Sequence, residues 1–270
     1  SSAASDVYKS QEEPDCSIQD FNQSLVGANA YLGSEGIVEA LQQKADVVIT
    51  GRVADPSLFL APLQHFFEWE FNDWARAGAG TMIGHLMECA AQVTGGYFAD
   101  PEYKNVNNLA TVGFPIAEVQ PDGAAIISKL DGTGGCVDLR TVKEQLLYEV
   151  HDPARYLTPD VTADFSSVRL NLEGVDRVSI SGARGTERPQ QLKTTVSFDG
   201  GFLGEAELSY AGAGAEQRAR MANAIVVERL QNVHGIQTTL RCDLIGVSSL
   251  HSTAGQYTIC LLYTSDAADE

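Results

Sequence analysis

The sequence is poor in positive charge. Of its 270 residues, 18 are Lys or Arg and 36 are Asp or Glu, which gives a formal net charge of −18 at pH 7. A field of this sign repels polyanions, so the composition excludes nucleic acid as a partner. Hydrophobic residues make up 44% and charged residues 20% of the chain, which indicates a folded rather than a disordered protein.

Long apolar runs and paired cysteines are also missing. No stretch reaches the roughly 20 apolar residues that cross a bilayer, so we expect no membrane partner. The five cysteines are scattered and form no C-x-x-C pair, which predicts a reducing, cytoplasmic location. The G-x-S-x-G and H-E-x-x-H motifs are absent, so serine-hydrolase and zincin chemistry have no support. The sequence identifies no cofactor and predicts no metal centre.

The first half of the chain predicts helices around a parallel sheet. Residues 1–24 are polar and aperiodic, and we interpret them as a loop or a cut end. The β-branched run at 45–50 predicts a buried parallel strand, followed by a turn at 51–56. Asp55 is the expected N-cap of the helix that follows. Further helices are expected at 37–41, at 73–94 with an apolar stripe, from Thr141 with a Thr141/Glu144 capping box, and at 216–230.

The second half predicts antiparallel pairing. Residues 168–172 and 177–181 alternate around a Glu-Gly turn, and 192–198 and 202–210 flank an Asp-Gly-Gly turn. A last strand is expected at 238–247. The expected fold class is therefore α/β, with a mixed sheet that has a parallel, helix-flanked first part and antiparallel hairpins in the second part.

The last eleven residues, 260–270, resemble the translated end of a sequencing adapter, and an acidic solvated tail is the alternative. Their removal would delete three acidic residues and no basic one, which changes the net charge from −18 to −15. The argument from charge holds in either case.

The turn at 51–56 is the first candidate site. It lies between a predicted strand end and a helix N-terminus, where open α/β sheets bind ligands and where anions are favoured. Arg52 offers a bidentate fork to a carboxylate or phosphate, and Gly51 lets the backbone approach the ligand closely. The alternative is that Asp55 is only a helix cap and Arg52 only its ion-pair partner.

The second candidate site lies on the predicted helix at 73–94. His85, Glu88, Cys89 and Gln92 follow one another at helical spacing and share one face, which suits an acid–base pair better than a metal. We take His85 and Glu88 as candidate catalytic residues. His151, at the end of a later helix, is a further candidate general acid or base. The alternatives are a polar interface in which His85 and Glu88 satisfy each other, and a His151 that only solvates helix carbonyls.

A glycine-rich loop is the third candidate. Thr133, Gly134 and Gly135 are flanked by basic residues, and successive backbone amides of such a loop bind phosphate. The loop matches neither a P-loop nor G-x-G-x-x-G, so a simple turn is the alternative.

Several long motifs resemble the acyclic terpene utilisation (AtuA-type) protein family. They span residues 25–250 and lie at 28–33, 45–56, 84–89, 92–100, 113–119 and 141–160. The resemblance implies an α/β domain over 25–258 that is incomplete at its N-terminus, because family members begin with a further α/β segment. It also implies a cytoplasmic role in the catabolism of acyclic terpenes such as citronellol and geraniol, through branched acyl-CoA thioesters. It implies no settled reaction.

Together these features favour a lyase- or hydratase-like enzyme acting on a branched acyl-CoA or its acid. Arg52 would anchor the anion, and His85, Glu88 or His151 would move protons. The expected partner is a small-molecule substrate, with an acyl-CoA among the candidates, and a homo-oligomer is an open alternative. A non-catalytic binding or assembly subunit of an acyl-CoA pathway is the alternative function, because the chain carries no established catalytic signature.

Overall fold

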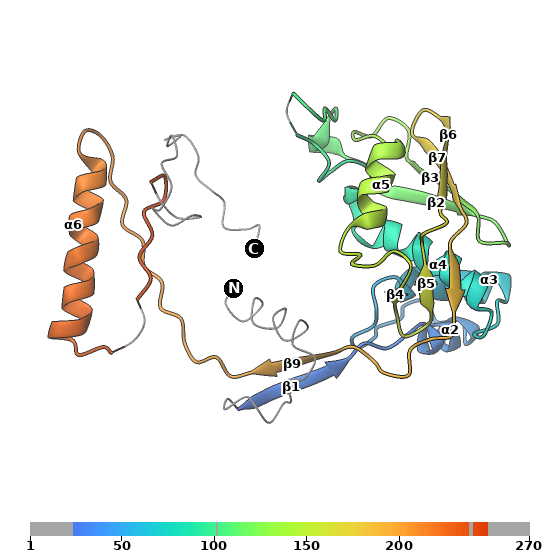
Figure 1. Ribbon diagram of the computed structural model, residues 1–270, viewed down its shortest axis with the longest axis horizontal. Helices are drawn as coiled ribbons and strands as arrows, with labels where there is room; N and C mark the ends of the chain where they lie inside the picture. The colour runs from blue at the N-terminus through green and yellow to red at the C-terminus, as the bar shows by residue number, and fades with distance from the viewer. Residues whose placement is uncertain (1–23, 101, 238–239, 248–270) are drawn as a thin grey trace. The chain divides into compact units, whose positions relative to one another are not determined.

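A computed structural model describes residues 24–100, 102–237 and 240–247 (Figure 1). Most of the predicted polar segment 1–24 and all of the terminal segment 260–270 lie outside the described residues. The chain divides into two units, of which the larger is Asn22–Asp199 and the other holds the residues after Asp199. Both candidate sites and the glycine-rich loop lie in the larger unit.

Three antiparallel sheets form the β structure of the larger unit (Figure 1). The largest sheet has the strand order β2-β3-β7-β6, and the hairpin predicted at 168–181 is confirmed as β6 and β7. The bounds are Pro115–Val119 for β2, Ala125–Lys129 for β3, Arg169–Gly174 for β6 and Arg177–Ser181 for β7. The smaller sheets are β4-β5-β8 (Tyr156–Leu157, Thr162–Asp164, Arg184–Thr186) and β1-β9 (Leu25–Ala30, Thr194–Phe198).

The prediction of a parallel first part of the sheet is wrong for the described residues. Residues 45–50 form no strand, and the side chains of Val47 and Ile49 are 77% and 92% exposed. Parallel pairing among described residues is limited to two isolated bridges, Leu32 with Val53 and Val112 with Gly134. A β-branched run favours extended backbone, but burial as a strand needs a neighbouring strand on each side. No such neighbour pairs with 45–50 in the described part of the chain.

The second predicted hairpin is also wrong. Strand β9 forms within the expected range, but it pairs with β1 rather than with 202–210, which contain no strand. A tight Asp-Gly-Gly turn permits a hairpin, whereas the choice of partner depends on which strand buries more surface. The described part of the last predicted strand, 240–247, likewise contains no strand.

Helices cover the sheets of the larger unit. They are α2 (Glu35–Gln42), α3 (Ser57–Phe67), α4 (Trp74–Glu88) and α5 (Leu139–Leu147), with short 3₁₀ turns at Ala90–Gln92 and Leu109–Thr111. The second unit contains α6 (Ala215–Glu228), which confirms the helix predicted at 216–230, and a π-helical turn at Arg229–Val233. None of the helices in the described residues has the length and apolar character needed to cross a membrane.

Helix α4 is the centre of the main hydrophobic core. Every residue from Ala77 to Leu86 is buried, so the predicted division into an apolar and a polar face does not hold along this stretch. The helix also ends at Glu88 rather than at residue 94. Glycines make this central position possible: a Cβ on Gly78 would lie 2.2 Å from the carbonyl oxygen of Arg184 in β8. Core residues of β3, β7 and α5 pack around α4.

Two predicted helix caps are shifted. The side chain of Asp55 makes no capping hydrogen bond to α3. The first amides of α3 already donate to carbonyl oxygens of the preceding turn; the Ser57 amide, for example, donates to Ala54 O at 2.9 Å. At α5 the capping box joins Asp138 and Thr141, one turn earlier than predicted. An aspartate caps better than a threonine when both are within reach of the first turn.

Candidate functional site

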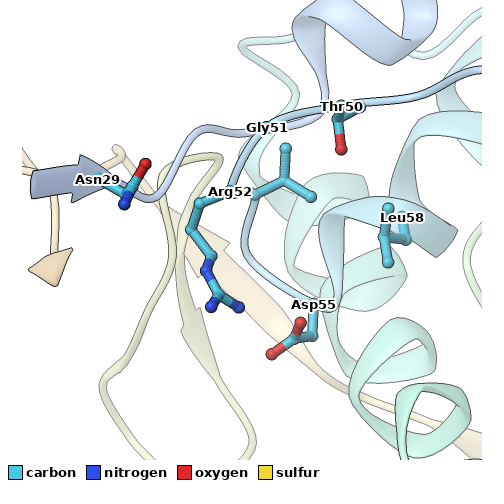
Figure 2. Close-up of a pocket in the computed structure, with 7 residues that line it drawn as sticks. Asn29, Thr50, Gly51, Arg52, Asp55 and Leu58 are labelled. Atoms are coloured by element: carbon cyan, nitrogen blue, oxygen red, sulfur yellow. The ribbon is translucent and has the colours of Figure 1, made fainter. Parts of the chain in front are cut away.

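The loop at 51–56 lines an open pocket of about 430 Å³ (Figure 2). Its backbone is fixed by two hydrogen bonds with Leu32, two residues after the end of β1: Leu32 N to Arg52 O at 3.1 Å and Ala54 N to Leu32 O at 2.9 Å. Arg52 and Asp55 both project from the loop, with Asn29 of β1 facing Arg52 in Figure 2. The pocket is lined by Asn29, Thr50, Gly51, Arg52, Val53, Asp55 and Leu58.

A glycine in α4 brings this loop against the second candidate site. A Cβ on Gly84 would lie 2.5 Å from the carbonyl oxygen of Pro56, so only glycine permits this packing. Since Gly84 precedes His85 and Pro56 follows Asp55, the contact places the pocket loop beside the C-terminal half of α4. The two candidate sites, far apart in the sequence, are therefore neighbours.

The pKa of Asp55 is affected by a charge on the pocket loop and by a charge on α4. Burial raises the pKa of its carboxyl group above the usual value, and the nearby charge of Glu88 raises this pKa further. The positive charges of Arg52 and Lys193 oppose the rise in the pKa without cancelling it. Asp55 thus lies within electrostatic reach of the Arg52 end and of the Glu88 end of the site.

Asp55→Asn should stabilise the protein at neutral pH. Because the pKa of Asp55 is raised by folding, the ionised carboxylate is less favourable in the folded than in the unfolded chain. The neutral amide removes this cost, so the variant should melt higher than the wild type at pH 7. The difference should shrink as the pH falls through the raised pKa toward the ordinary value of 3.8 and vanish below it. Melting curves from pH 7 to pH 4 measure this, and a variant that melts lower than the wild type at pH 7 would contradict it.

His85 is enclosed by aromatic rings. Its side chain is 1% exposed, and its ring centroid lies 5.3 Å from that of Tyr156 and 6.1 Å from that of Phe165. The Nδ1 atom is 3.5 Å from the Glu88 Oε1 atom, and neither ring nitrogen makes a hydrogen bond with a described residue. Glu88 is 16% exposed, so it can reach a ligand while His85 cannot. His85 and Glu88, the pair predicted from helical spacing, are adjacent in the structure, and the histidine is the more deeply buried of the two.

Tyr156, which the sequence analysis did not propose, completes this site beside Cys89 of the predicted helix face. Burial and the charges of Glu88, Asp55 and Glu149 raise the pKa of Tyr156, so its hydroxyl stays protonated at neutral pH. Burial also raises the pKa of the Cys89 thiol to about 11. Both groups are therefore hydrogen-bond donors rather than anions. Tyr156 lies 71 residues after His85 and belongs to no motif, so no signal in the sequence could have identified it.

His151 is placed apart from these residues. It is exposed in the loop after α5, and no hydrogen bond, ion pair or ring contact joins it to His85, Glu88 or Arg52 in the described part of the chain. The adjacent Asp152 accepts a hydrogen bond from the Ala154 amide at 3.0 Å. We leave His151 out of the site.

The amides of the glycine-rich loop are already engaged. Gly134 N donates to Thr111 O at 2.8 Å, and Gly135 N donates to Asn107 O at 2.9 Å. The amides of Thr133 and Cys136 also donate to backbone carbonyls. A Cβ on Gly134 would lie 1.8 Å from the carbonyl oxygen of Asn108, so the glycine serves a close backbone approach. None of these four amides is available to hold a phosphate.

A buried carboxylate anchors the pocket loop from behind. Asp160 is 6% exposed, and its Oδ1 atom accepts hydrogen bonds from the Ser34 amide at 2.7 Å and the Ser34 hydroxyl at 2.8 Å. Its Oδ2 atom accepts from the Ser57 hydroxyl at 2.5 Å. Gly33 is required here, because a Cβ at that position would lie 2.3 Å from Oδ1. One carboxylate therefore joins the first residues of α2 and α3, the helices on either side of the pocket loop.

The described residues contain no group of three or more His, Cys, Asp and Glu side chains arranged to hold a metal ion. The site as built offers a guanidinium, carboxylates, a phenol and a thiol. These groups can bind an anion and transfer protons.

Comparison with known proteins identifies the family of this chain. The model of the acyclic terpene utilisation family protein AtuA matches residues 2–270. No curated protein and no solved structure matches the chain. Because the family model covers nearly all of the sequence, the chain belongs to the acyclic terpene utilisation (AtuA) family.

Proposed function

We propose that this chain is an enzyme of acyclic terpene utilisation that acts on a branched acyl-CoA or its acid by a lyase- or hydratase-like step. Family membership supports the role in terpene utilisation. The chemistry of the site supports an enzyme, because it combines an anion-binding side chain with a partly exposed carboxylate and a protonated phenol. The free Cys89, Cys136 and Cys242 fit a reducing compartment, and we place the activity in the cytoplasm.

One observation carries this proposal. The loop that holds Arg52 and Asp55 packs against α4 at Gly84, where a Cβ would lie 2.5 Å from the carbonyl oxygen of Pro56, and Glu88 lies one turn further along the helix. Arg52, the proposed anion-binding residue, and the carboxylate of Glu88 thus lie on two segments that pack against each other. A ligand whose anionic group is held by Arg52 can present its carbon skeleton to Glu88.

Each residue has a distinct part in the proposed reaction. Arg52 binds the anionic group of the ligand, and Glu88 removes the proton from C2, next to the acyl carbonyl. Tyr156 donates its phenolic proton to the leaving hydroxyl group at C3. His85 does not touch the ligand, and we assign it as a positioning residue whose Nδ1 atom lies 3.5 Å from the Glu88 Oε1 atom.

The step is balanced for the dehydration of a 3-hydroxyacyl compound. The C2–H bond and the C3–O bond break, a C2=C3 double bond forms, and the hydroxyl group leaves as water with the proton of Tyr156. The tyrosinate then recovers a proton from Glu88, so both residues return to their starting states. Hydration of the enoyl compound is the reverse of these steps.

Removing Arg52 should weaken ligand binding. Arg52→Ala loses the charged hydrogen bonds to the anionic group, so we expect the Kd of a branched 3-hydroxyacyl-CoA, or of its free acid, to rise about 10- to 100-fold. Isothermal titration with the full chain measures this. Arg220→Ala is the matched control, because among the described residues this exposed arginine of α6 pairs only with Glu216, at 2.7 Å. Equal Kd values for wild type and Arg52→Ala would refute the anion site.

One observation favours the alternative function of a non-catalytic binding or assembly subunit. Val47 and Ile49 are large, exposed apolar side chains close in sequence to Thr50 of the pocket. Exposed apolar groups of this kind mark surfaces that other proteins cover. The two functions differ in hydrogen exchange at C2 of a bound acyl-CoA in D₂O, which the enzyme accelerates and an assembly subunit does not.

A further inference from the structure

The largest sheet ends in a strand whose outer side is open. Strand β6 is the last strand in the order β2-β3-β7-β6, and no strand of the described residues pairs with its outer side (Figure 1). All of its residues except Leu170 are exposed. An edge strand of this kind presents a row of backbone amides and carbonyls with which a further strand can pair.

The two edges of this sheet differ in their capacity to pair. The opposite edge strand, β2, begins with Pro115, which has no amide hydrogen to donate. Strand β6 contains neither proline nor lysine, which are residues that keep edge strands from pairing with other chains. Its pairing with β7 is regular from Arg169 to Leu172, and the irregularity comes only after Leu172. The β6 edge is therefore the side of the sheet that can accept another strand.

The two leucines of β6 lie on the face of the sheet that covers the core. Leu170 pairs with Ile180 and Leu172 pairs with Val178, and both partners in β7 are buried. Leu170 packs against the main hydrophobic core, whereas Leu172 is 59% exposed at the open edge. An apolar side chain on a neighbouring strand would cover Leu172.

The other face of β6 carries one charge of each sign. Asn171 pairs with Ser179 of β7, and the Ser179 hydroxyl donates a hydrogen bond to Glu173 at 2.6 Å, so these side chains share a face. Arg169 lies on the same face, two residues before Asn171. It forms no ion pair with a carboxylate of the described residues. The positive and the negative charge are thus equally distant from Asn171 along the strand.

We propose that β6 pairs with β6 of a second copy of this chain, antiparallel and about a two-fold axis at Asn171, so that one continuous sheet crosses both copies. In this register Arg169 lies opposite Glu173 of the partner subunit, and Leu170 lies opposite Leu172 of the partner subunit. Each pair occurs twice, because a two-fold interface uses the same surface of both chains. Opposite charges and apolar side chains directly across a strand pair stabilise the pairing.

The order of residues in β6 favours a second copy over another partner. A charged residue, Leu, Asn, Leu and a charged residue follow one another, and only the sign of the charge differs between the two ends. Antiparallel pairing of the strand with itself brings this pattern into register. The charges of Arg169 and Glu173 cancel, so the strand adds nothing to the repulsion between two chains that each carry a net charge of −18. The proposal uses no residue of the pocket and is independent of the proposed function.

Reversal of charge tests this pairing. Arg169→Glu places like charges opposite each other at both ends of the interface and should raise the Kd of the dimer at least about tenfold. The double variant Arg169→Glu/Glu173→Arg exchanges the charges and should restore the wild-type Kd. Sedimentation equilibrium of the full chain measures this Kd, which should be about 1–100 µM because an interface between two edge strands is small. Arg155→Glu is the matched control, because it makes the same change in net charge at an exposed arginine outside β6 and should leave the Kd unchanged.

A cross-link locates the two-fold axis. Asn171→Cys places a thiol opposite its own copy, at the Cα separation of roughly 4.5–5.5 Å between antiparallel neighbours, which a disulfide can span. Mild oxidation should therefore link this variant into a covalent dimer, whereas the wild type and Ser179→Cys, one strand further from the axis, should stay unlinked. Melting curves followed by circular dichroism establish that each variant is folded.

Three results would each overturn the proposal. They are a wild type that is still monomeric at about 1 mM, a Kd that Arg169→Glu leaves unchanged, and a folded Asn171→Cys variant that does not cross-link.

Discussion

Glu88→Gln should abolish hydrogen exchange at C2 of a branched acyl-CoA while leaving its binding nearly unchanged. The amide has the shape of the carboxylate but cannot accept a proton, and loss of a general base costs about 10²- to 10⁴-fold in rate. NMR in D₂O follows the exchange, and isothermal titration follows binding. Because Arg52 holds the anionic group, the Kd should change by less than about threefold.

The control for this variant is another glutamate-to-glutamine change away from the pocket. Glu39 is exposed on α2, and its side chain accepts a hydrogen bond from Gln43 at 3.4 Å and from no other residue in the described part of the chain. Glu39→Gln should keep the full exchange rate. A Glu88→Gln variant that exchanges C2 hydrogen as fast as the wild type would refute the assignment of Glu88 as the base.

His85→Phe distinguishes the positioning of Glu88 from simple packing. Phenylalanine keeps an aromatic ring between Tyr156 and Phe165, at 5.3 Å and 6.1 Å from their centroids in the wild type, but removes Nδ1. If His85 only fills space, the pH profile of the exchange rate stays the same. If it positions Glu88, the profile moves along the pH axis and the rate falls, by less than in Glu88→Gln.

Asp160→Ala should destabilise the protein by about 2–5 kcal/mol, because it leaves two buried donors without an acceptor, each at a cost of roughly 1–3 kcal/mol. These donors are the Ser34 amide and the Ser57 hydroxyl, at 2.7 and 2.5 Å from the carboxylate. The Ser34 hydroxyl keeps the Gln64 Oε1 atom as an acceptor, at 2.6 Å. Domains are stable by only about 5–15 kcal/mol, so the loss is a large fraction of the total. Urea denaturation followed by circular dichroism measures it.

Two variants test whether hydrogen bonding is the cause. Asp160→Asn keeps one acceptor oxygen and offers an amide to the Ser57 hydroxyl, so it should cost about half as much as Asp160→Ala. Asp152→Ala removes an exposed aspartate that accepts one amide hydrogen bond at 3.0 Å, and should cost less than about 1 kcal/mol. Equal costs for Asp160→Ala and Asp152→Ala would contradict the role of the buried carboxylate.

The effect of Asp160 should extend to ligand binding. Its hydrogen bonds hold Ser34 and Ser57, which follow the segments that carry Tyr31 and Arg52 in the chain. Loosening this anchor lets the two segments move apart. At temperatures where Asp160→Asn remains folded, we therefore expect it to weaken the binding of the acyl-CoA ligand that Arg52 holds.

The local pattern determined most of the elements of this fold. Alternation around Glu-Gly predicted β6 and β7, and helical spacing predicted α2, α5 and α6 within a few residues. The predicted cap at Asp55 indicated the start of α3, whereas α4 ends six residues before its predicted end at residue 94. These patterns depend only on residues that are close in the sequence, so they predict helices and strands without knowledge of the tertiary structure. The pairing of β1 with β9 cannot be predicted from local sequence, because the two strands lie more than 160 residues apart and their register is set by contact alone.

The same distinction holds for the site. The spacing of His85 and Glu88 on one helix and the position of Arg52 before another could be read from the sequence. Their proximity depends on Gly84, which admits Pro56 to within a distance that any side chain would block. The exposure of 45–50, the stacking of Arg52 and Lys193 over Tyr31, and the use of all four amides at 133–136 were likewise decided by packing.

The sequence by itself determined the family, the acidic character of the chain, most of the helices and which residue types can carry acid–base chemistry. Only the tertiary structure decided which of these residues share a site, because proximity between distant segments arises from close packing and backbone pairing that no local pattern records. It packed the loop of Arg52 against α4 at Gly84, placed Tyr156 against His85, and engaged the amides of the glycine-rich loop in backbone hydrogen bonds.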